Sequence, residues 1–511
     1  MNDDGAAPRC EGGRFFEFIE FVGFIVGEFI GLIRFISKKP KKPNTPKELA
    51  SEDGVTHGKT IERGEVRREV LRLALPVTVS NLLHRMVTAI DILLVGGLGA
   101  PAVAAVGLGQ LLVFISMTVV WGLSTGTMVA VAQRWGADRR AEAGRIAVHG
   151  LVATLILTVP LAAAGMAFAA EAAGLLGAQL PVQLLVQEYC RWVFLAFPAT
   201  AVVHVLTSTM HGAGDTRTPM RIYVIMNLFH ISLAVPLIYG YLDLPALGVQ
   251  GAAIAVASAE VLGVLLLWWQ GWAKGHLAKG GWELAYIRPV FHIGWPVAMD
   301  RMIWQAGQVV YAKILLLYGT AAFATHQLGV NVEALSFMPG LAIGVAAATV
   351  VGQSVGRGDV IRARLGMVEA NRLGILFMGG MGVLFFLFPG PLLQLFTSDS
   401  QLIRLGEVFL RIAALSQIPL AVTLVLQGAL RGAGDTPYIL GVTILGIWGV
   451  RIPLAAAAAW WGLGVAYVWW AFLIDWVARM VLMQRRCRSS RWERKDLEIT
   501  PIALDPVAGD R

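Results

Sequence analysis

Charged residues are scarce in this sequence and make up 15% of its 511 residues. Soluble proteins carry roughly 25%, so a soluble globular fold is disfavoured. Cysteines number only three and lie far apart (Cys10, Cys190 and Cys487), which excludes a disulfide framework and a cysteine-based metal site. No cleavable signal peptide is evident, because the apolar stretch near the start contains Glu residues and lacks a convincing cleavage site.

Sequence motifs of enzymes are missing as well. The chain contains no HExxH, no GxSxG and no phosphate-binding GxxxxGK[ST] pattern. We therefore expect neither a cofactor nor a resident metal, and a membrane-integral enzyme is kept only as the alternative from another functional class. The net charge of +8 does not predict a nucleic-acid partner, because Lys and Arg lie in short loops between apolar runs.

Hydrophobic residues account for 56% of the chain and are gathered in long runs, as in proteins that cross a membrane many times. One pentapeptide occurs twice, at residues 212–216 and again at residues 432–436 (Gly-Ala-Gly-Asp-Thr, GAGDT). The offset of 220 residues (432 − 212) also carries other residues onto identical ones: Pro76 onto Pro296, Gly99 onto Gly319, Gln133 onto Gln353 and Gly136 onto Gly356. An ungapped match of this length indicates an internal duplication.

The hydropathy pattern predicts twelve helices, six in each repeat. We place them near 70–95, 102–132, 146–169, 183–208, 219–240, 247–271, 289–316, 323–352, 366–388, 403–429, 438–459 and 463–484. The predicted fold is an all-α membrane protein with twelve transmembrane helices in two six-helix repeats. Because six is even, the repeats should be related by a pseudo-two-fold axis along the membrane normal, in a V shape with a central cavity.

The predicted organisation has four parts. Residues 1–66 form an N-terminal extension in which 15–36 reads as an amphipathic helix on the membrane surface, or alternatively as an additional span. A lysine cluster at 38–42 is suited to anionic membrane lipid. Residues 67–285 and 286–486 form the two six-helix lobes, and 487–511 form a tail.

Lys and Arg occur in alternate loops, which predicts the orientation of the chain. Basic residues mark the loops near 134–145, 217–221, 274–288, 357–364 and 431 and the tail, whereas the intervening loops are almost free of them. Such alternation places both termini in the cytoplasm, and we expect a multi-pass protein of the plasma membrane, the inner membrane of a bacterium.

Each GAGDT lies in a predicted cytoplasmic turn between two spans. Glycine permits left-handed backbone and close helix approach, and Asp followed by Thr can cap the next helix. We interpret both copies as tight helix–turn–helix corners and favour this structural role over direct ion binding.

Asp91 lies within the first predicted span, where an ionised carboxylate costs on the order of 2.5–3.5 kcal/mol. It should therefore be paired, protonated or facing water. Asn81, His84 and Thr88 share its helix face, and His230 in the fifth span can titrate near neutral pH. Each of these residues could instead be a structural, hydrogen-bonded core residue.

Further membrane-embedded acids are secondary candidates for ion coupling, again with a structural hydrogen bond as the alternative: Glu260, Asp300, Glu333 and Asp435. A soft, aromatic lining for a polyspecific pocket is expected from Met299, Met302, Trp304, Gln327, Phe337 and Met338. Such residues can equally face lipid.

Taken together, several motifs resemble the multidrug and toxic compound extrusion (MATE) transporters. The carriers of the resemblance are Leu73-Ala74-Leu75-Pro76-Val77, Asp91, Gly96–Ala100, Ala324-Thr325-His326-Gln327-Leu328, Phe337-Met338-Pro339-Gly340 and both GAGDT corners, within about 67–485. The resemblance implies export of amphipathic, often cationic compounds in exchange for H⁺ or Na⁺, with Asp91 as a coupling residue. We expect the protein to be a monomer.

The sequence also departs from that family. Where some members have an Asn and an Asp in the fifth helix, this chain has His230 and Ala234, and where some have a Glu in the seventh helix it has Trp304. The alternative within the broader superfamily is a lipid-linked oligosaccharide flippase. A flippase cavity should be strongly basic, yet embedded cations are few: Arg85, Arg301, Lys313 and Arg451.

Overall fold

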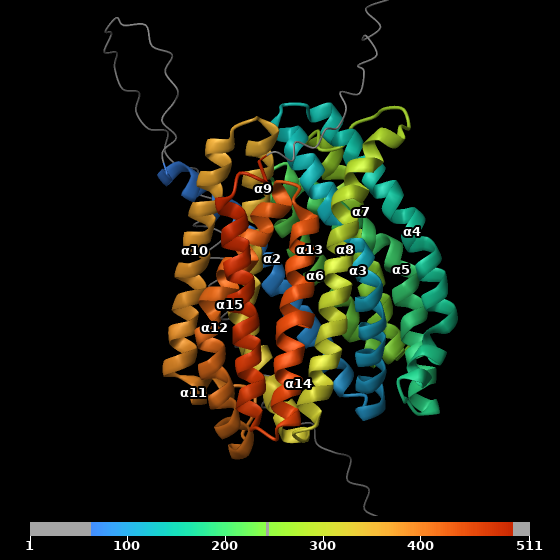
Figure 1. Ribbon diagram of the computed structural model, residues 1–511. Helices are drawn as coiled ribbons and strands as arrows, with labels where there is room; N and C mark the ends of the chain where they lie inside the picture. Colours follow the sequence, from blue (N-terminus) through green and yellow to red (C-terminus); the bar gives the residue numbers. More distant parts are fainter. Residues whose placement is uncertain (1–62, 242–244, 494–511) are drawn as a thin grey trace, which may run out of the picture. The chain divides into compact units, whose positions relative to one another are not determined.

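The computed structural model describes residues 63–241 and 245–493, and every regular element in this part of the chain is helical. Figure 1 shows the long helices running beside one another. The first repeat contains α2 (Arg63–Gly96), α3 (Ala100–Gly136), α4 (Arg140–Leu175), α5 (Leu180–Gly212), α6 (Arg217–Tyr239) and α7 (Val249–Ala273). The second contains α8 (Leu284–Leu316), α9 (Thr320–Gly356), α10 (Val360–Leu387), the short α11 (Pro389–Gln394), α12 (Ser400–Gly432), α13 (Thr436–Ile444), the π-helix η1 (Leu445–Arg451), α14 (Ile452–Trp460) and α15 (Val465–Arg488).

Within the described residues, eleven helices are long and apolar enough to cross a membrane, with α13, η1 and α14 counted as one span, Thr436–Trp460. The one remaining span of the twelve is α8, the seventh along the chain, which has 33 residues but carries Asp300, Arg301 and Lys313. It packs against α3 on one side and α13 on the other. The prediction of twelve spans in two repeats is therefore confirmed.

Several predicted helix boundaries were wrong. The first span begins at Arg63 rather than near 70, and the third at Arg140 rather than near 146, because Arg and Glu are good helix formers and extend the helix beyond the apolar stretch. The predicted loop at 389–402 begins with α11, and the eleventh span contains a π-helix that hydropathy does not reveal. The predicted surface helix at 15–36 lies outside the described residues.

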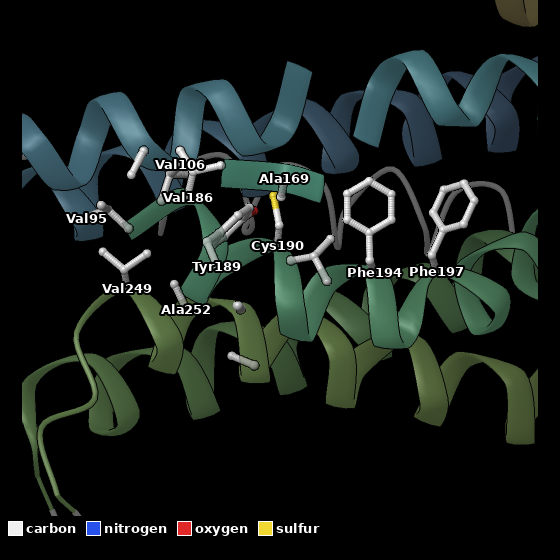
Figure 2. Close-up of a cluster of buried hydrophobic side chains, with 14 of the residues drawn as sticks. Val95, Val106, Ala169, Val186, Tyr189, Cys190, Phe194, Phe197, Val249 and Ala252 are labelled. Atoms are coloured by element: carbon white, nitrogen blue, oxygen red, sulfur yellow. The ribbon is translucent and has the colours of Figure 1, made fainter. Parts of the chain in front are cut away.

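Each repeat has an apolar core of its own near one end of the bundle. In the first repeat this core joins α2, α3, α4, α5, α6 and α7. Figure 2 shows Val186 and Tyr189 of α5 near Val106 of α3, with Phe194 and Phe197 further along α5. In the second repeat the corresponding core is built from α8, α9, α10, α11, α12, α14 and α15. Neither of these two cores takes buried residues from the other repeat.

At the GAGDT end, by contrast, the cores of the two repeats merge. Val66, Val70 and Ala74, at the start of α2, are buried among α9, α10 and α12 of the second repeat. Tyr286 and Val290, at the start of α8, are buried among helices of the first repeat. Each repeat thus inserts the start of its first helix into the other, as the internal symmetry requires.

Glycines allow the closest contacts at this end. A Cβ on Gly136 would lie 2.0 Å from the carbonyl oxygen of Gln353, and one on its repeat equivalent Gly356 would lie 1.9 Å from that of Gln133. Both distances are far below van der Waals contact, so only glycine permits α3 and α9 to meet here. The two repeats are joined at the GAGDT end.

Candidate functional site

A buried acid and a buried histidine meet inside the first repeat. Asp91 on α2 is 8% exposed and His230 on α6 is 2% exposed, and His230 Nε2 lies 3.3 Å from Asp91 Oδ1. Among the described residues, Asp91 Oδ1 and both ring nitrogens of His230 lack a well-formed hydrogen bond. Buried polar atoms normally have partners, so this arrangement suits a group that gains and loses a proton or a small cation.

Tyr189 on α5 extends this site. It is 5% exposed, its hydroxyl hydrogen-bonds with Gln110 of α3, and it lies close enough to Asp91 to interact electrostatically. Its ring lies against Gly109, where a Cβ would come within 2.5 Å of it. Sequence reasoning missed Tyr189 and Gln110, because no motif marks them and the contact depends on how α5 packs against α3.

The remaining residues of the predicted Asp91 face are placed differently. Asn81 is half-buried and His84 is exposed. The electrostatic neighbours of His84 are Arg85 and His204 of α5. They differ from the neighbour of Asp91, which is His230. The side chain of Thr88 lies outside the described part of the structure. Roles for these three residues in ion coupling stay predictions.

Glu260 on α7 occupies a second polar position in the first repeat. It is half-buried, and its Oε2 has no hydrogen-bond partner among the described residues. Its electrostatic neighbour is Tyr223 of α6.

The acids of the second repeat have defined partners. Asp300 accepts a hydrogen bond of 3.1 Å from Arg431. Glu333 accepts one of 3.0 Å from the amide of Gln417, whose oxygen accepts from Ser336. Asp435, fully buried, accepts from Arg486 Nε at 2.6 Å. These contacts favour structural roles for all three acids.

The first GAGDT corner shows how such an acid stabilises a turn. Asp215 accepts hydrogen bonds from the backbone N–H and the hydroxyl of Thr218, and Lys274 Nζ lies 2.8 Å from its Oδ2. Burial acts to raise the pKa of Asp215, but the contact with His276 (Nε2 to Oδ2, 3.5 Å) and the hydrogen bonds from Lys274 and Thr218 outweigh it and hold that pKa well below its usual range. The carboxylate ties α6 to the segment after α7.

Side chains predicted to line a substrate pocket are not gathered into one described cavity. Met302 and Gln327 are exposed, whereas Met299, Trp304, Phe337 and Met338 are half-buried, and Phe337 packs against the core of the second repeat. Their contact with substrate stays a prediction.

A buried ion cluster in the second repeat was missed. Asp475 on α15 is fully buried and lies 2.6 Å from Arg451 Nη2, at the end of η1, and 2.6 Å from Arg479 Nε. A Cβ on Gly446 would come within 2.2 Å of Asp475 Oδ1, so glycine there permits η1 to approach. Only Arg451 was noted from the sequence, since its partner lies on a separate span.

Comparison with known proteins places this architecture in a family. The family profile described as MatE matches residues 76–235 and 296–457, one stretch in each repeat. The chain belongs to the MatE family. The MatE matches begin at Pro76 and Pro296, the two prolines that the internal duplication superimposes.

Several relatives within the MatE family support the assignment. A probable multidrug resistance protein NorM of Thermotoga maritima is 30% identical over 439 residues, covering 84% of this chain and 94% of the relative. The multidrug resistance protein PmpM of Pseudomonas aeruginosa is 27% identical over 400 residues, covering 76% and 83%.

Solved structures share the MatE fold. A MATE transporter of Vibrio cholerae, VcmN, superimposes with a TM-score of 0.78 at 19% identity, covering 84% of this chain and 99% of VcmN. A MOP superfamily transporter from Pyrococcus furiosus does so with a TM-score of 0.78 at 20% identity, covering 83% and 96%. The predicted fold class is confirmed, and the chain is a multi-pass membrane transporter of the MatE family.

Proposed function

We propose that this MatE protein is a secondary antiporter that exports amphipathic organic cations in exchange for H⁺ or Na⁺. The observation that carries the proposal is the contact between Asp91 and His230, two titratable groups buried together without a well-formed hydrogen bond. Because no Lys or Arg side chain of the described residues is paired with Asp91, its carboxylate is available to bind a proton or Na⁺.

Coupling follows if ion and substrate compete for the same carboxylate. A proton or Na⁺ bound at Asp91 removes the negative charge that attracts a cationic substrate, so uptake of the ion favours release of the substrate. The energies are of the right size: tenfold uphill export costs about 1.4 kcal/mol, and one pH unit supplies about as much per proton.

Alternating access fits the way in which the repeats are joined. Merged cores and the glycine contacts close the GAGDT end, while each repeat keeps a separate core toward the other end. Rocking one repeat against the other would open the joined end and close the opposite one.

The proposed orientation places the joined end in the cytoplasm. Its loops carry the basic residues, including Arg139, Arg140 and Arg357, and such residues favour the cytoplasmic side. The described conformation would then face outward, in the plasma membrane that is the inner membrane of a bacterium, with both termini inside.

The embedded arginines do not favour the flippase alternative. Arg431 pairs with Asp300, and Arg451 and Arg479 share Asp475. Arg301 lies over the ring of Trp121 at 5.9 Å, across the boundary between the repeats. Two carboxylates therefore neutralise half of the charge of these four arginines, and three of the four are held by Asp300 and Asp475 within the second repeat. They do not gather into the strongly basic cavity expected of a lipid-linked oligosaccharide flippase.

The proposal is tested by export of a fluorescent organic cation such as ethidium from proteoliposomes with separately imposed H⁺ and Na⁺ gradients. Wild-type protein should respond to at least one gradient, and Asp91→Asn should lose the response. Asp138→Asn is the matched control, because this loop acid carries a side chain that is 85% exposed. Gradient-driven export by Asp91→Asn at the wild-type rate would disprove the assignment.

A further inference from the structure

The internal duplication identifies the second-repeat counterpart of the Asp91–His230 contact. The offset that superimposes Pro76 on Pro296 places Tyr311 at the position of Asp91. On the helix after each GAGDT corner, a shift of 221 residues (451 − 230), one more than in the preceding part of the repeat, aligns His230-Ile231-Ser232-Leu233-Ala234 with Arg451-Ile452-Pro453-Leu454-Ala455, in which Ile, Leu and Ala are identical. The π-helix η1 (Leu445–Arg451), which lies between the second corner and this segment and has no counterpart in α6, accommodates the additional residue. Arg451 therefore stands where the first repeat has His230.

The structure keeps this correspondence in space. His230 contacts Asp91 at 3.3 Å in the first repeat, and the guanidinium of Arg451 lies 5.8 Å from the ring centre of Tyr311 in the second. One repeat thus holds an acid with a titratable base. The other holds, at the same positions, a phenol with a permanent cation.

Arg451 is enclosed on every side. It is 1% exposed, it pairs with Asp475 at 2.6 Å, it donates to Gln308 at 3.2 Å, and it lies over the rings of Phe472 and Trp476 at 4.5 and 5.6 Å. The other charged or titratable groups near it are Arg479 on α15, Tyr311 on α8, and His326 and Glu333 on α9. Carboxylate, amide oxygen and aromatic faces are the surroundings of a bound cation.

We propose that Arg451 is a tethered cation: its guanidinium occupies, in the second repeat, the place that the coupling ion takes in the first. The second repeat then binds no coupling ion, and each transport cycle uses the Asp91 site alone. The use of one coupling ion per cycle rests on the proposed function, whereas the occupation of a cation site beside Asp475 by Arg451 is independent of it.

The chemistry of arginine suits this role. A guanidinium does not lose its proton in proteins, so it cannot act as a coupling ion that is bound and released in each cycle. Its covalent attachment gives it an effective concentration far above that of a dissolved ion. Arg451 therefore occupies the space between Asp475 and the aromatic rings without exchanging with dissolved ions, so the second repeat needs no coupling ion of its own.

An ordinary structural ion pair would give much the same static picture, so the test asks whether a free cation can replace the side chain. Purified Arg451→Ala is heated in up to 20 mM guanidinium (about ten times a low-millimolar dissociation constant), with urea at equal concentration as the neutral control. We expect guanidinium, but not urea, to raise the unfolding temperature of Arg451→Ala by about 2 °C. Wild type and Arg451→Ala/Asp475→Asn should show no such rise.

Arg451→Lys keeps a covalently attached cation and should therefore retain gradient-driven export. This variant replaces Arg451→Ala in the test if Arg451→Ala cannot be purified. Loss of all coupled export in Arg451→Lys, or the absence of a guanidinium-specific rise in folded Arg451→Ala, would overturn the assignment of Arg451.

The stoichiometry is tested in the protein with Arg451 intact, by counting ion-dependent signals. The Asp91→Asn variant should bind no H⁺ or Na⁺ that responds to substrate, and a second substrate-sensitive ion persisting in it would overturn the single-site claim. If guanidinium rescue succeeds while Asp91→Asn still couples normally, the proposed function fails but the tethered cation stands. The two failures are thus distinguishable.

Discussion

The side-chain amide of Gln133, in the first repeat, donates a hydrogen bond of 2.9 Å to the carbonyl oxygen of Gly432, in the second. The repeat-related bond also forms: Gln353 donates to the carbonyl oxygen of Gly212 at 2.8 Å. Both acceptors are the first glycines of the GAGDT corners, and both amides are buried. The duplicated motif is therefore half of a reciprocal contact that holds the repeats together at one end.

Removing one of these amides should loosen the joined end. Gln133→Leu and Gln353→Leu each leave a buried carbonyl without its donor, at a cost of about 1–3 kcal/mol, which shifts the balance roughly 5- to 150-fold toward the parted form. Spin labels at Arg139→Cys and Arg357→Cys, in a cysteine-free background, should show a larger population at long distance. Gln401→Leu, on the exposed start of α12, is the control, and unchanged distance distributions in both variants would show that the bonds do not hold this end.

A methyl group at the glycine contact should block closure of this end. Gly136→Ala places a Cβ 2.0 Å from the Gln353 carbonyl oxygen, a clash that flexible side chains cannot relieve and that costs about 1–3 kcal/mol or more. We expect export to fall at least tenfold while the separate repeat cores remain folded, as measured by transport and by near-ultraviolet circular dichroism. Gly96→Ala, which meets no atom within 4 Å, should transport normally; equal activity of both variants would contradict the packing.

The first corner should contribute stability that depends on pH in a defined direction. The pKa of Asp215 is lowered in the folded protein, so its contribution is fully present above the unfolded value of about 3.9 and is lost as pH falls toward the folded pKa. Asp215→Asn should lower the free energy of unfolding by about 1–3 kcal/mol near neutral pH. The difference from wild type should be constant between pH 5 and 7 and shrink below pH 4; a difference that instead grew on acidification would contradict the assignment.

Asp435, in the second GAGDT corner, should affect stability without affecting ion coupling, unlike Asp91. Asp435→Asn removes the partner of Arg486 at a fully buried position and should destabilise the protein by about 3–5 kcal/mol. The protein that remains folded should keep its response to ion gradients, because our proposal assigns ion coupling to Asp91 and a structural role to Asp435. Thermal unfolding and gradient-driven export in the same preparation check this pair of outcomes, and loss of the gradient response without loss of stability would assign Asp435 to coupling instead.

Much of the fold could be read from the sequence, because long apolar runs and an ungapped duplication leave few alternatives. Asp91 and His230 were also predictable, since a buried acid and a buried base within spans are costly and therefore noticeable. The pairing of Arg451 with Asp475 was not, because hydropathy places residues on helices without saying which helices touch. The same limit hid the Gln133–Gly432 contact: the repeat showed both residues, but not that each amide reaches the other copy.

The central claim is that a cationic substrate and the coupling ion compete at Asp91. The direct measurement is ion release on addition of tetraphenylphosphonium to purified protein, followed by a pH indicator in weak buffer and by ²²Na⁺ in sodium-loaded protein. Wild type should release about one H⁺ or one Na⁺ per bound cation, and Asp91→Asn should release none. Equal release from the two proteins, or binding of the cation without release of either ion by wild type, would contradict the account.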